Sequence, residues 1–320
     1  MKGIHQITIS NSSVKYEISL KRNITIIRGD SATGKTTLVE MIREYYESGE
    51  ASGINLICDK ECRVLAGRDW KTILPNVKDS IVFIDEDNDF LPTNEFARAV
   101  RDSDNYYCLV TREGLPNLPY SVDEIYGIRS SGKYAGLKQV YHEFYHIYGD
   151  HQPFETIIPD EIIVEDSNSG YEFFKEVSKD KEYAVVSAEG KSNIFAATSG
   201  KTDKNVVVIA DGAAFGSEMD RLMKLVSKNN KITLYLPESI EWLILSSDVL
   251  QDGEVNEILN DPSDNIESSE YFSWERFFTK LLVDKTAGSY LKYSKDHINP
   301  AYLNGTVVKK IIGCIRDIKL

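Results

Sequence analysis

Apolar residues along this chain fall into two alternating patterns, short continuous runs and longer stretches with helical spacing. The runs predict buried strands of a largely parallel sheet, and the helical stretches predict the crossover helices between them. In the first half, strands are predicted at residues 4–9, 15–20, 24–28, 54–58, 63–66, 80–85, 106–110 and 121–128. Helices are predicted there at residues 36–46, 70–74 and 93–101.

A second alternation begins after the polar, broken stretch at residues 148–155. Its predicted strands cover residues 161–165, 183–188, 206–211 and 232–237, and its predicted helices cover residues 169–178, 191–198 and 216–228. The last 50 residues have a helical pattern. The sequence therefore predicts an α/β protein with α/β domains at residues 1–150 and 151–262 and a helical C-terminal segment at residues 263–320.

The composition is that of a globular protein, with 42% hydrophobic and 27% charged residues. Apolar runs stay well short of the roughly 20 residues that cross a bilayer, and the first residues lack a signal-peptide core, so we expect a cytoplasmic protein without membrane contact. The net charge of −13 argues against broad binding of polyanions, although a local patch or bound metal ions could still hold nucleic acid. Cys58 and Cys62 are near neighbours, but no second pair has zinc-ligand spacing, so we expect reduced thiols of no particular function.

Residues 29–36 match the phosphate-binding pattern G-x-x-x-x-G-K-[ST]. The glycines let backbone N–H groups turn into one concavity, and the following helix directs its positive dipole end at the phosphates. Lys35 adds a charge beside the β and γ phosphates, and the Thr36 hydroxyl suits Mg²⁺. The residues expected to bind the nucleotide here are Gly29, Asp30, Ser31, Ala32, Thr33, Gly34, Lys35, Thr36 and Thr37.

Polar residues also follow two other predicted strands of the first domain. Asp85 is expected to hold Mg²⁺ directly or through water, and Glu86 is placed to orient or deprotonate the attacking water. An exposed acidic turn is the alternative for this pair. Thr111 and Arg112 follow the next strand, where a polar sensor of the γ phosphate is expected, with a surface salt bridge as the alternative.

These motifs resemble P-loop ATPases. The two strands before the loop, and the run GKTTL at residues 34–38, are similar to the ABC-type branch. That branch also carries a Ser-Gly-Gly stretch shortly before its aspartate strand, which this chain lacks, and the separation of Lys35 from Asp85 is short. The resemblance therefore implies an ATP- and Mg²⁺-binding ATPase with a trimmed ABC/AAA-like core, and it does not extend to the sandwich dimers of ABC proteins.

Polar groups follow all four predicted strands of the second domain. Ligands of open parallel α/β sheets lie at the carboxyl ends of the strands, where carboxylates can converge on one or two divalent cations. Glu165 ends the first strand, Asp211 ends the third and Glu241 follows the fourth. These three are the expected ligands of Mg²⁺ or Mn²⁺, with Glu165 and Asp211 as the expected catalytic residues.

This pattern resembles the Toprim fold of topoisomerases, primases and overcoming-lysogenisation-defect nucleases. In that family a glutamate ends the first strand, and an Asp-x-Asp motif ends the third, often with a glycine a few residues on. Glu165 matches the glutamate, Asp211 the first aspartate and Gly216 the glycine. A flavodoxin-like or Rossmann-like domain with solvated strand-end acids is the alternative.

The second aspartate of the Toprim motif falls on Ala213, which removes one metal-contacting carboxylate. The candidates to compensate are Glu218, Asp220 and Glu241. Residues 190–193 and 237–241 are similar to a Toprim subgroup that occurs fused to ATPase domains in prokaryotic defence systems.

The combined resemblance implies an ATP-dependent nuclease or nuclease-derived effector, in defence against phage. Two other classes remain open: a non-catalytic regulator or scaffold that ATP switches, and a small-molecule kinase, for which no arginine-rich lid is visible. Nucleic acid, a protein partner or a second copy of the chain are the expected partners besides the nucleotide. The aromatic helix at residues 271–278 is interpreted as core packing or a dimer face, with a base-stacking platform as the alternative.

Overall fold

The computed structural model describes residues 1–30, 33–131, 139–149 and 156–320. Two compact units account for the contacts of the chain. The first comprises Met1–Gly149 with Asp261–Ser273, and the second comprises Asp150–Asn260 with Trp274–Leu320. The domain boundary expected between residues 150 and 151 lies outside the described residues.

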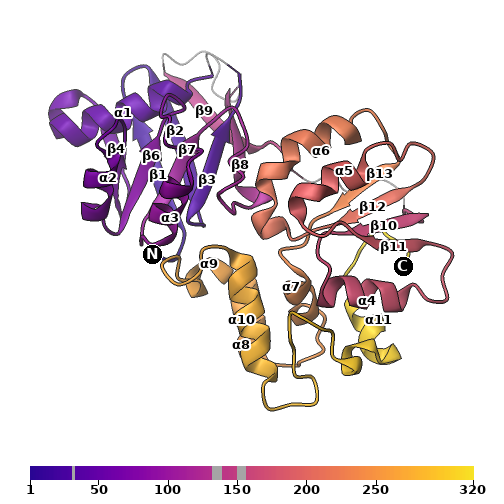
Figure 1. The fold of residues 1–320 in the computed structure, drawn as a ribbon. Coiled ribbons are helices and arrows are strands. Elements are labelled where there is room, and N and C mark those ends of the chain that lie inside the picture. Colours follow the sequence, from indigo (N-terminus) through magenta and orange to yellow (C-terminus); the bar gives the residue numbers. More distant parts are fainter. Residues whose placement is uncertain (31–32, 132–138, 150–155) are drawn as a thin grey trace. The chain divides into compact units, whose positions relative to one another are not determined.

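One mixed sheet organises the described part of the first unit (Figure 1). Its strands are β1 (His5–Ser10), β2 (Val14–Leu20), β3 (Ile24–Arg28), β4 (Asn55–Ile57), β5 (Glu61–Val64), β6 (Ser80–Ile84), β7 (Tyr106–Val110), β8 (Ile125–Ser130) and β9 (Val140–His146). They lie in the order β4-β1-β2-β9-β8-β3-β7-β6-β5. The strands from β8 to β5 are parallel to one another, whereas β1 pairs antiparallel with β2 and β4, and β8 with β9.

The central strands are buried on both faces, which explains their continuous apolar sequences. Successive side chains of a strand point to opposite faces, so neighbours enter different cores. One core joins Ile27 and Phe83 to α1 (Lys35–Ser48), and the other joins Ile26 and Val82 to α3 (Asn94–Arg101). The short helix α2 (Trp70–Ile73) adds Trp70 to the second core.

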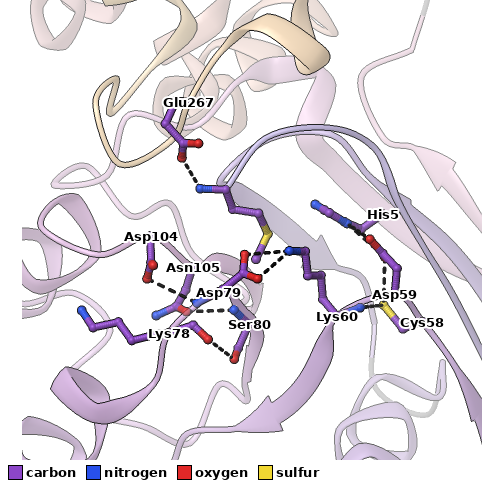
Figure 2. Close-up of polar contacts among 11 residues, drawn as sticks. His5, Cys58, Asp59, Lys60, Lys78, Asp79, Ser80, Asp104, Asn105 and Glu267 are labelled. Atoms are coloured by element: carbon purple, nitrogen blue, oxygen red, sulfur yellow. Dashed lines mark hydrogen bonds and ion pairs between the residues drawn. The ribbon is translucent and has the colours of Figure 1, made fainter.

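A late segment of the chain, Asp261–Ser273, packs with the first unit and includes α9 (Pro262–Asn265). The Gly3 N–H donates to the Ser263 carbonyl at 2.8 Å, and the Ser268 N–H donates to the Met1 carbonyl at 3.0 Å. The Met1 amino group also forms an ion pair with Glu267 (Figure 2). These bonds attach the segment to the residues that precede β1.

The described part of the second unit has a four-stranded parallel sheet in the order β11-β10-β12-β13. Its strands are β10 (Glu161–Val164), β11 (Ala184–Ser187), β12 (Val206–Ile209) and β13 (Ile232–Tyr235). The helices are α4 (Ser169–Val177), α5 (Ile194–Thr198), α6 (Met219–Val226), α7 (Ile240–Leu245), α8 (Gly253–Asn260), α10 (Trp274–Thr286) and α11 (Gly305–Gly313). Both units are thus α/β, as the sequence predicts.

Three strands of the first unit differ from the sequence-based expectation. Strand β5 begins at Glu61, two residues before the expected strand at residues 63–66. The strand predicted at residues 121–128 begins only at Ile125, because Val122–Glu124 forms a 3-10 turn in which the Asp123 N–H donates to the Ser121 hydroxyl at 3.2 Å. Strand β9 is not predicted at all, because its mostly exposed, polar and aromatic residues lack an apolar run. In the described residues, no helix has the length and apolarity needed to span a bilayer.

Candidate functional site

The loop between β3 and α1 carries the glycines of the sequence motif, and Ser31 and Ala32 within it lie outside the described residues. Gly34 has φ 93°, a left-handed backbone conformation that residues other than glycine rarely adopt. A Cβ at Gly34 would lie 2.7 Å from the Tyr16 hydroxyl, which itself donates a hydrogen bond to the Gly34 carbonyl at 2.9 Å. Both the backbone angle and the close approach of β2 therefore require glycine at this position.

The Lys35 side chain turns into the loop and is only 6% exposed. Its ammonium donates to the Gly29 carbonyl at 2.8 Å, the Asp30 carbonyl at 2.6 Å and the Thr33 hydroxyl at 3.1 Å. Three oxygens of the loop thus hold one positive charge at its centre. These oxygens are neutral, and no carboxylate of the described residues forms an ion pair with the Lys35 ammonium.

Helix α1 starts directly at Lys35 with Gly34 as its N-cap, and no described side chain caps its first N–H groups. Its first turn also contains no acidic residue. Thr36 and Thr37 are exposed on this turn, so their hydroxyls are accessible to a ligand. The positive end of the helix dipole and the Lys35 ammonium therefore act at the same place.

Three parallel strands bring the other predicted residues to this edge of the sheet. β7 lies between β3 and β6, so the carboxyl ends of β3, β7 and β6 adjoin. The Arg112 guanidinium after β7 holds both carboxylate oxygens of Glu86 after β6, at 2.6 to 3.0 Å. Asp85 accepts the Glu86 N–H through Oδ1 at 2.8 Å. Asp85 and Glu86 are half-buried and Arg112 is exposed.

A buried carboxylate that the sequence did not single out lies toward the other end of β3. Glu124 has no exposed surface, and its Oε2 accepts the Thr25 hydroxyl at 3.2 Å, while Arg22 approaches Oε1 to 3.5 Å. Burial raises the pKa of Glu124 to about 7, although Arg22 and Lys21 act in the opposite direction. Its burial near the start of β3, away from the glycine loop that follows this strand, indicates a structural role.

In the second unit, the two predicted catalytic carboxylates lie together. Val164 of β10 pairs with Ile209 of β12, so the residues after both strands meet at one edge. The Asp211 N–H donates to Glu165 Oε2 at 3.0 Å. Gly212 packs tightly against the chain just after β13. A Cβ at Gly212 would lie 2.5 Å from the Leu236 carbonyl oxygen.

Burial and neighbouring negative charges shift the titration of this pair. Burial raises the pKa of Glu165 to about 7 and raises that of Asp211 well above its ordinary value. The charges that add most to the Asp211 shift come from Glu275, Glu165 and Glu241. Glu218 and Asp220, the other two candidates to compensate for Ala213, are not among them.

Glu241 is fully buried, and Tyr293 donates its hydroxyl hydrogen to Glu241 Oε1 at 3.0 Å. The second oxygen of Glu241 has no hydrogen-bond partner among the described residues. A cavity of about 20 Å³, room for roughly one water, has a mostly apolar lining that also includes Glu165, Asp166 and Asp211. The site therefore contains both an unused acceptor and a small space beside the carboxylates.

Two residues of this cluster were missed by the sequence analysis. The Lys295 ammonium forms an ion pair with Glu275 Oε1 at 2.5 Å. Burial alone would lower the pKa of Lys295, but Glu241, Glu275 and Asp211 raise it instead. Glu275 could have been noticed as a charge within the aromatic helix at residues 271–278, whereas no pattern marks Lys295.

The carboxylates of the second unit are close but do not form a ready coordination shell. Among the described residues, no group of three or more His, Cys, Asp or Glu side chains has a geometry that could hold a metal ion. A scan of protein-family models finds no match to this sequence, and a search of curated proteins finds none either.

Proposed function

We propose that the first unit binds a nucleoside triphosphate with Mg²⁺ and hydrolyses it. The observation that carries this proposal is the Lys35 ammonium held at the centre of the loop by three oxygens, beside the uncapped start of α1. A triphosphate tail is the ligand that best suits a ring of backbone amides, a helix N-terminus and a fixed ammonium. A P-loop fold with a trimmed ABC/AAA-like core is part of the proposal.

The neighbouring strand ends supply the remaining roles. Thr36 and Asp85 would hold Mg²⁺, which neutralises charge on the phosphates, and Glu86 would orient or deprotonate water. Arg112, which follows the strand between β3 and β6, would contact the γ phosphate. Arg112 and Glu86 pair with each other, so two oppositely charged groups lie side by side at this edge of the sheet.

A hydrolysis assay on Glu86→Gln tests this assignment. We expect nucleotide binding to persist while the rate of hydrolysis falls about 10²- to 10⁴-fold, the usual contribution of a general base. Asp87→Asn is the matched control, because Asp87 is an exposed acid in the same turn. If the two variants hydrolysed the nucleotide at equal rates, Glu86 would have no role in hydrolysis and would belong to an exposed acidic turn.

For the second unit, we propose a Toprim-like site that uses a divalent cation to cleave phosphodiester bonds in nucleic acid. The contact between Glu165 and Asp211, with Glu241 and Glu275 close by, supports it. Glu165, Asp211 and Glu241 would hold Mg²⁺ or Mn²⁺, which would polarise a phosphoryl oxygen and activate water. Glu275 offers the carboxylate that Ala213 lacks, and Lys295 offers a positive charge near the phosphate.

Thermal unfolding with Mn²⁺ and without nucleotide tests the site separately from cleavage. A ligand that binds only the folded state stabilises it, so Mn²⁺ should raise the unfolding temperature, and Asp211→Asn should abolish the increase. Glu172→Gln is the control, since Glu172 pairs with the exposed His297 elsewhere in the same unit. Metal-dependent cleavage of plasmid DNA or RNA, lost in Glu165→Ala, would then support a nuclease.

A second candidate is a non-catalytic protein that ATP switches, with a degenerate Toprim-like unit. Ala213 and the incomplete coordination shell favour it. Nucleotide binding without any cleavage in Mg²⁺ or Mn²⁺ would decide for this candidate. In either case we propose that the nucleotide state of the first unit controls the second.

A further inference from the structure

A buried tyrosine joins two other buried polar side chains in the second unit. Tyr293 is only 2% exposed, and Ser169 and Glu241 have no exposed surface. The Tyr293 hydroxyl donates to Glu241 Oε1 at 3.0 Å and lies 2.8 Å from the Ser169 hydroxyl. Because a tyrosine hydroxyl carries one hydrogen, the Ser169 hydroxyl must donate to Tyr293. The hydrogen bonds therefore run in one direction, from Ser169 through Tyr293 to Glu241.

The segment that follows α10 fixes the Tyr293 side chain. The Tyr293 N–H donates to the Thr286 hydroxyl at 2.9 Å. Its ring packs edge-on against Tyr302, with the ring centroids 6.0 Å apart and the planes at 86°. Tyr302 is fully buried, and its hydroxyl donates to the Leu291 carbonyl at 2.6 Å. Tyr293 is thus held at its backbone, ring and hydroxyl, and this fixed hydroxyl orients the Glu241 carboxylate.

The oriented carboxylate belongs to a helix start that is bonded to the strand end carrying Asp211. Glu241 lies in the first turn of α7, and the N–H of the preceding residue, Ile240, donates to Asp211 Oδ1 at 3.3 Å. The N–H of Gly212, next to Asp211, donates to the Pro237 carbonyl at 2.6 Å, shortly before the same helix. Backbone contacts therefore place Glu241 at the carboxylate pair of Glu165 and Asp211.

Tyr293 leaves one oxygen of Glu241 for a ligand. Glu241 Oε2 is buried and has no hydrogen-bond partner among the described residues. A buried carboxylate oxygen without a partner is costly, so this atom favours a cation beside it. In the cation site proposed for this unit, Oε2 is therefore the atom that Glu241 can offer, while the Tyr293 hydroxyl occupies Oε1.

We propose that Tyr293 is a positioning residue that makes the second unit select Mg²⁺ or Mn²⁺ over Ca²⁺. The inference rests on the cation site proposed above. Ca²⁺ takes about six to eight oxygen ligands and readily accepts both oxygens of one carboxylate, whereas Mg²⁺ takes about six in a small octahedron. Because the Tyr293 hydroxyl holds Oε1, Glu241 can supply only one oxygen. This limit disfavours the larger ion and suits the smaller ones.

Thermal unfolding of the full-length protein without nucleotide measures this selectivity. Separate titrations with Mn²⁺ and Ca²⁺ give an apparent Kd for each cation from the rise in unfolding temperature, and the rise that remains in Asp211→Asn is subtracted. We expect wild type to bind Mn²⁺ about tenfold or more tightly than Ca²⁺. Tyr293→Phe removes only the hydroxyl and frees Oε1, so this preference should fall by about tenfold, the usual size of an outer-shell effect on metal affinity.

Tyr302→Phe is the matched control, because it removes another buried tyrosine hydroxyl from the same cluster. Both variants should lose stability in the absence of cations, since each leaves a buried acceptor without its donor. Only Tyr293→Phe should change the ratio of the two Kd values, because a merely structural hydroxyl would affect both cations equally. An unchanged ratio in Tyr293→Phe, or the same change in both variants, would overturn the proposal and leave the cation site standing.

The wild-type titrations separate this inference from the site on which it rests. If Mn²⁺ stabilises wild type no more than Asp211→Asn, the cation site is absent and the selectivity falls with it. If Mn²⁺ stabilises wild type specifically but Ca²⁺ binds as tightly, the site stands and the role of Tyr293 is overturned. This comparison decides the matter even if Tyr293→Phe fails to fold, and a wild-type preference for Mn²⁺ then supports the proposal.

Discussion

The Arg112 guanidinium donates hydrogen bonds to both carboxylate oxygens of Glu86, and the two residues follow neighbouring parallel strands. Arg112 is exposed and Glu86 is half-buried, so the pair lies at the protein surface. It lies at the carboxyl edge of the sheet, where the glycine loop begins after β3. An exposed pair of this kind contributes little to stability, typically under about 1 kcal/mol. Its position therefore matters more for the proposed chemistry than for the fold.

Replacing Arg112 by alanine should separate these two roles. We expect ATP hydrolysis to fall at least about tenfold, because arginines that contact the γ phosphate stabilise the transition state, while unfolding free energy changes by less than about 1 kcal/mol. Arg101→Ala is the matched control, since Arg101 forms an exposed pair with Asp102 at 2.8 Å. If Arg112→Ala hydrolysed ATP at the wild-type rate, Arg112 would be a surface salt bridge and nothing more.

Gly34→Ala should destabilise the first unit through two separate effects. The left-handed backbone costs about 1 to 2 kcal/mol for a non-glycine residue, and the 2.7 Å contact with Tyr16 adds about 1 kcal/mol or more. Gly67→Ala is the control, because Gly67 has φ 78° but open space around it. Urea unfolding, followed by hydrogen exchange in β3, should show the larger loss for Gly34→Ala. Equal losses would mean that Tyr16 does not constrain the loop.

Glu124 predicts an unusual pH dependence of stability in the first unit. The pKa of Glu124 is about 7 in the folded state, against an ordinary value of 4.5. Between these two pH values, the folded protein keeps the Glu124 proton that the unfolded chain has released. Stability from this group is therefore present below about pH 4.5 and is lost as the pH rises through about 7. At 1.36 kcal/mol per unit, the loss is roughly 3 kcal/mol.

The measurement is the difference in unfolding free energy between Glu124→Gln and wild type, at about pH 5 and about pH 8. Glutamine resembles the protonated carboxyl, so wild type and Glu124→Gln should have similar unfolding free energies at about pH 5. At about pH 8, Glu124→Gln should be the more stable of the two. Hydrogen exchange in β3 reports this unit specifically, since Thr25 contacts Glu124. A difference that did not change with pH would contradict the raised pKa.

The sequence alone predicts the strands that carry the chemistry, because their signals are local. Residues 24–27 and residues 206–209 are continuous β-branched runs, and β3 and β12 lie there. The ends of parallel strands share an edge, so Glu165 and Asp211 could be placed together from their strands alone. A glycine motif with fixed spacing likewise located the loop, although the pattern could not show that Tyr16 packs on Gly34.

The features that escaped prediction depend on contacts between distant segments. Glu275 and Lys295 reach the Glu165 cluster from over 100 residues away, and an isolated charge in a helix has no periodic signal. Asp261–Ser273 packs with the first unit through backbone hydrogen bonds, the ion pair between the Met1 amino group and Glu267, and the buried Phe272. None of these contacts follows from a local sequence pattern. Strand β9 pairs with β2 and β8 despite its exposed residues, since its place is set by backbone pairing.

Nucleotide binding at the Lys35 loop underlies every other role assigned to the first unit. Isothermal calorimetry on folded protein should show association with ATP or GTP in the presence of Mg²⁺, and Lys35→Ala should weaken it at least about tenfold, since it removes the buried ammonium. Lys71→Ala, which removes an exposed pair with Glu95 and a cation–π contact with Trp70, should bind as wild type does. No heat with either nucleotide, or unchanged binding by Lys35→Ala, would contradict the proposal.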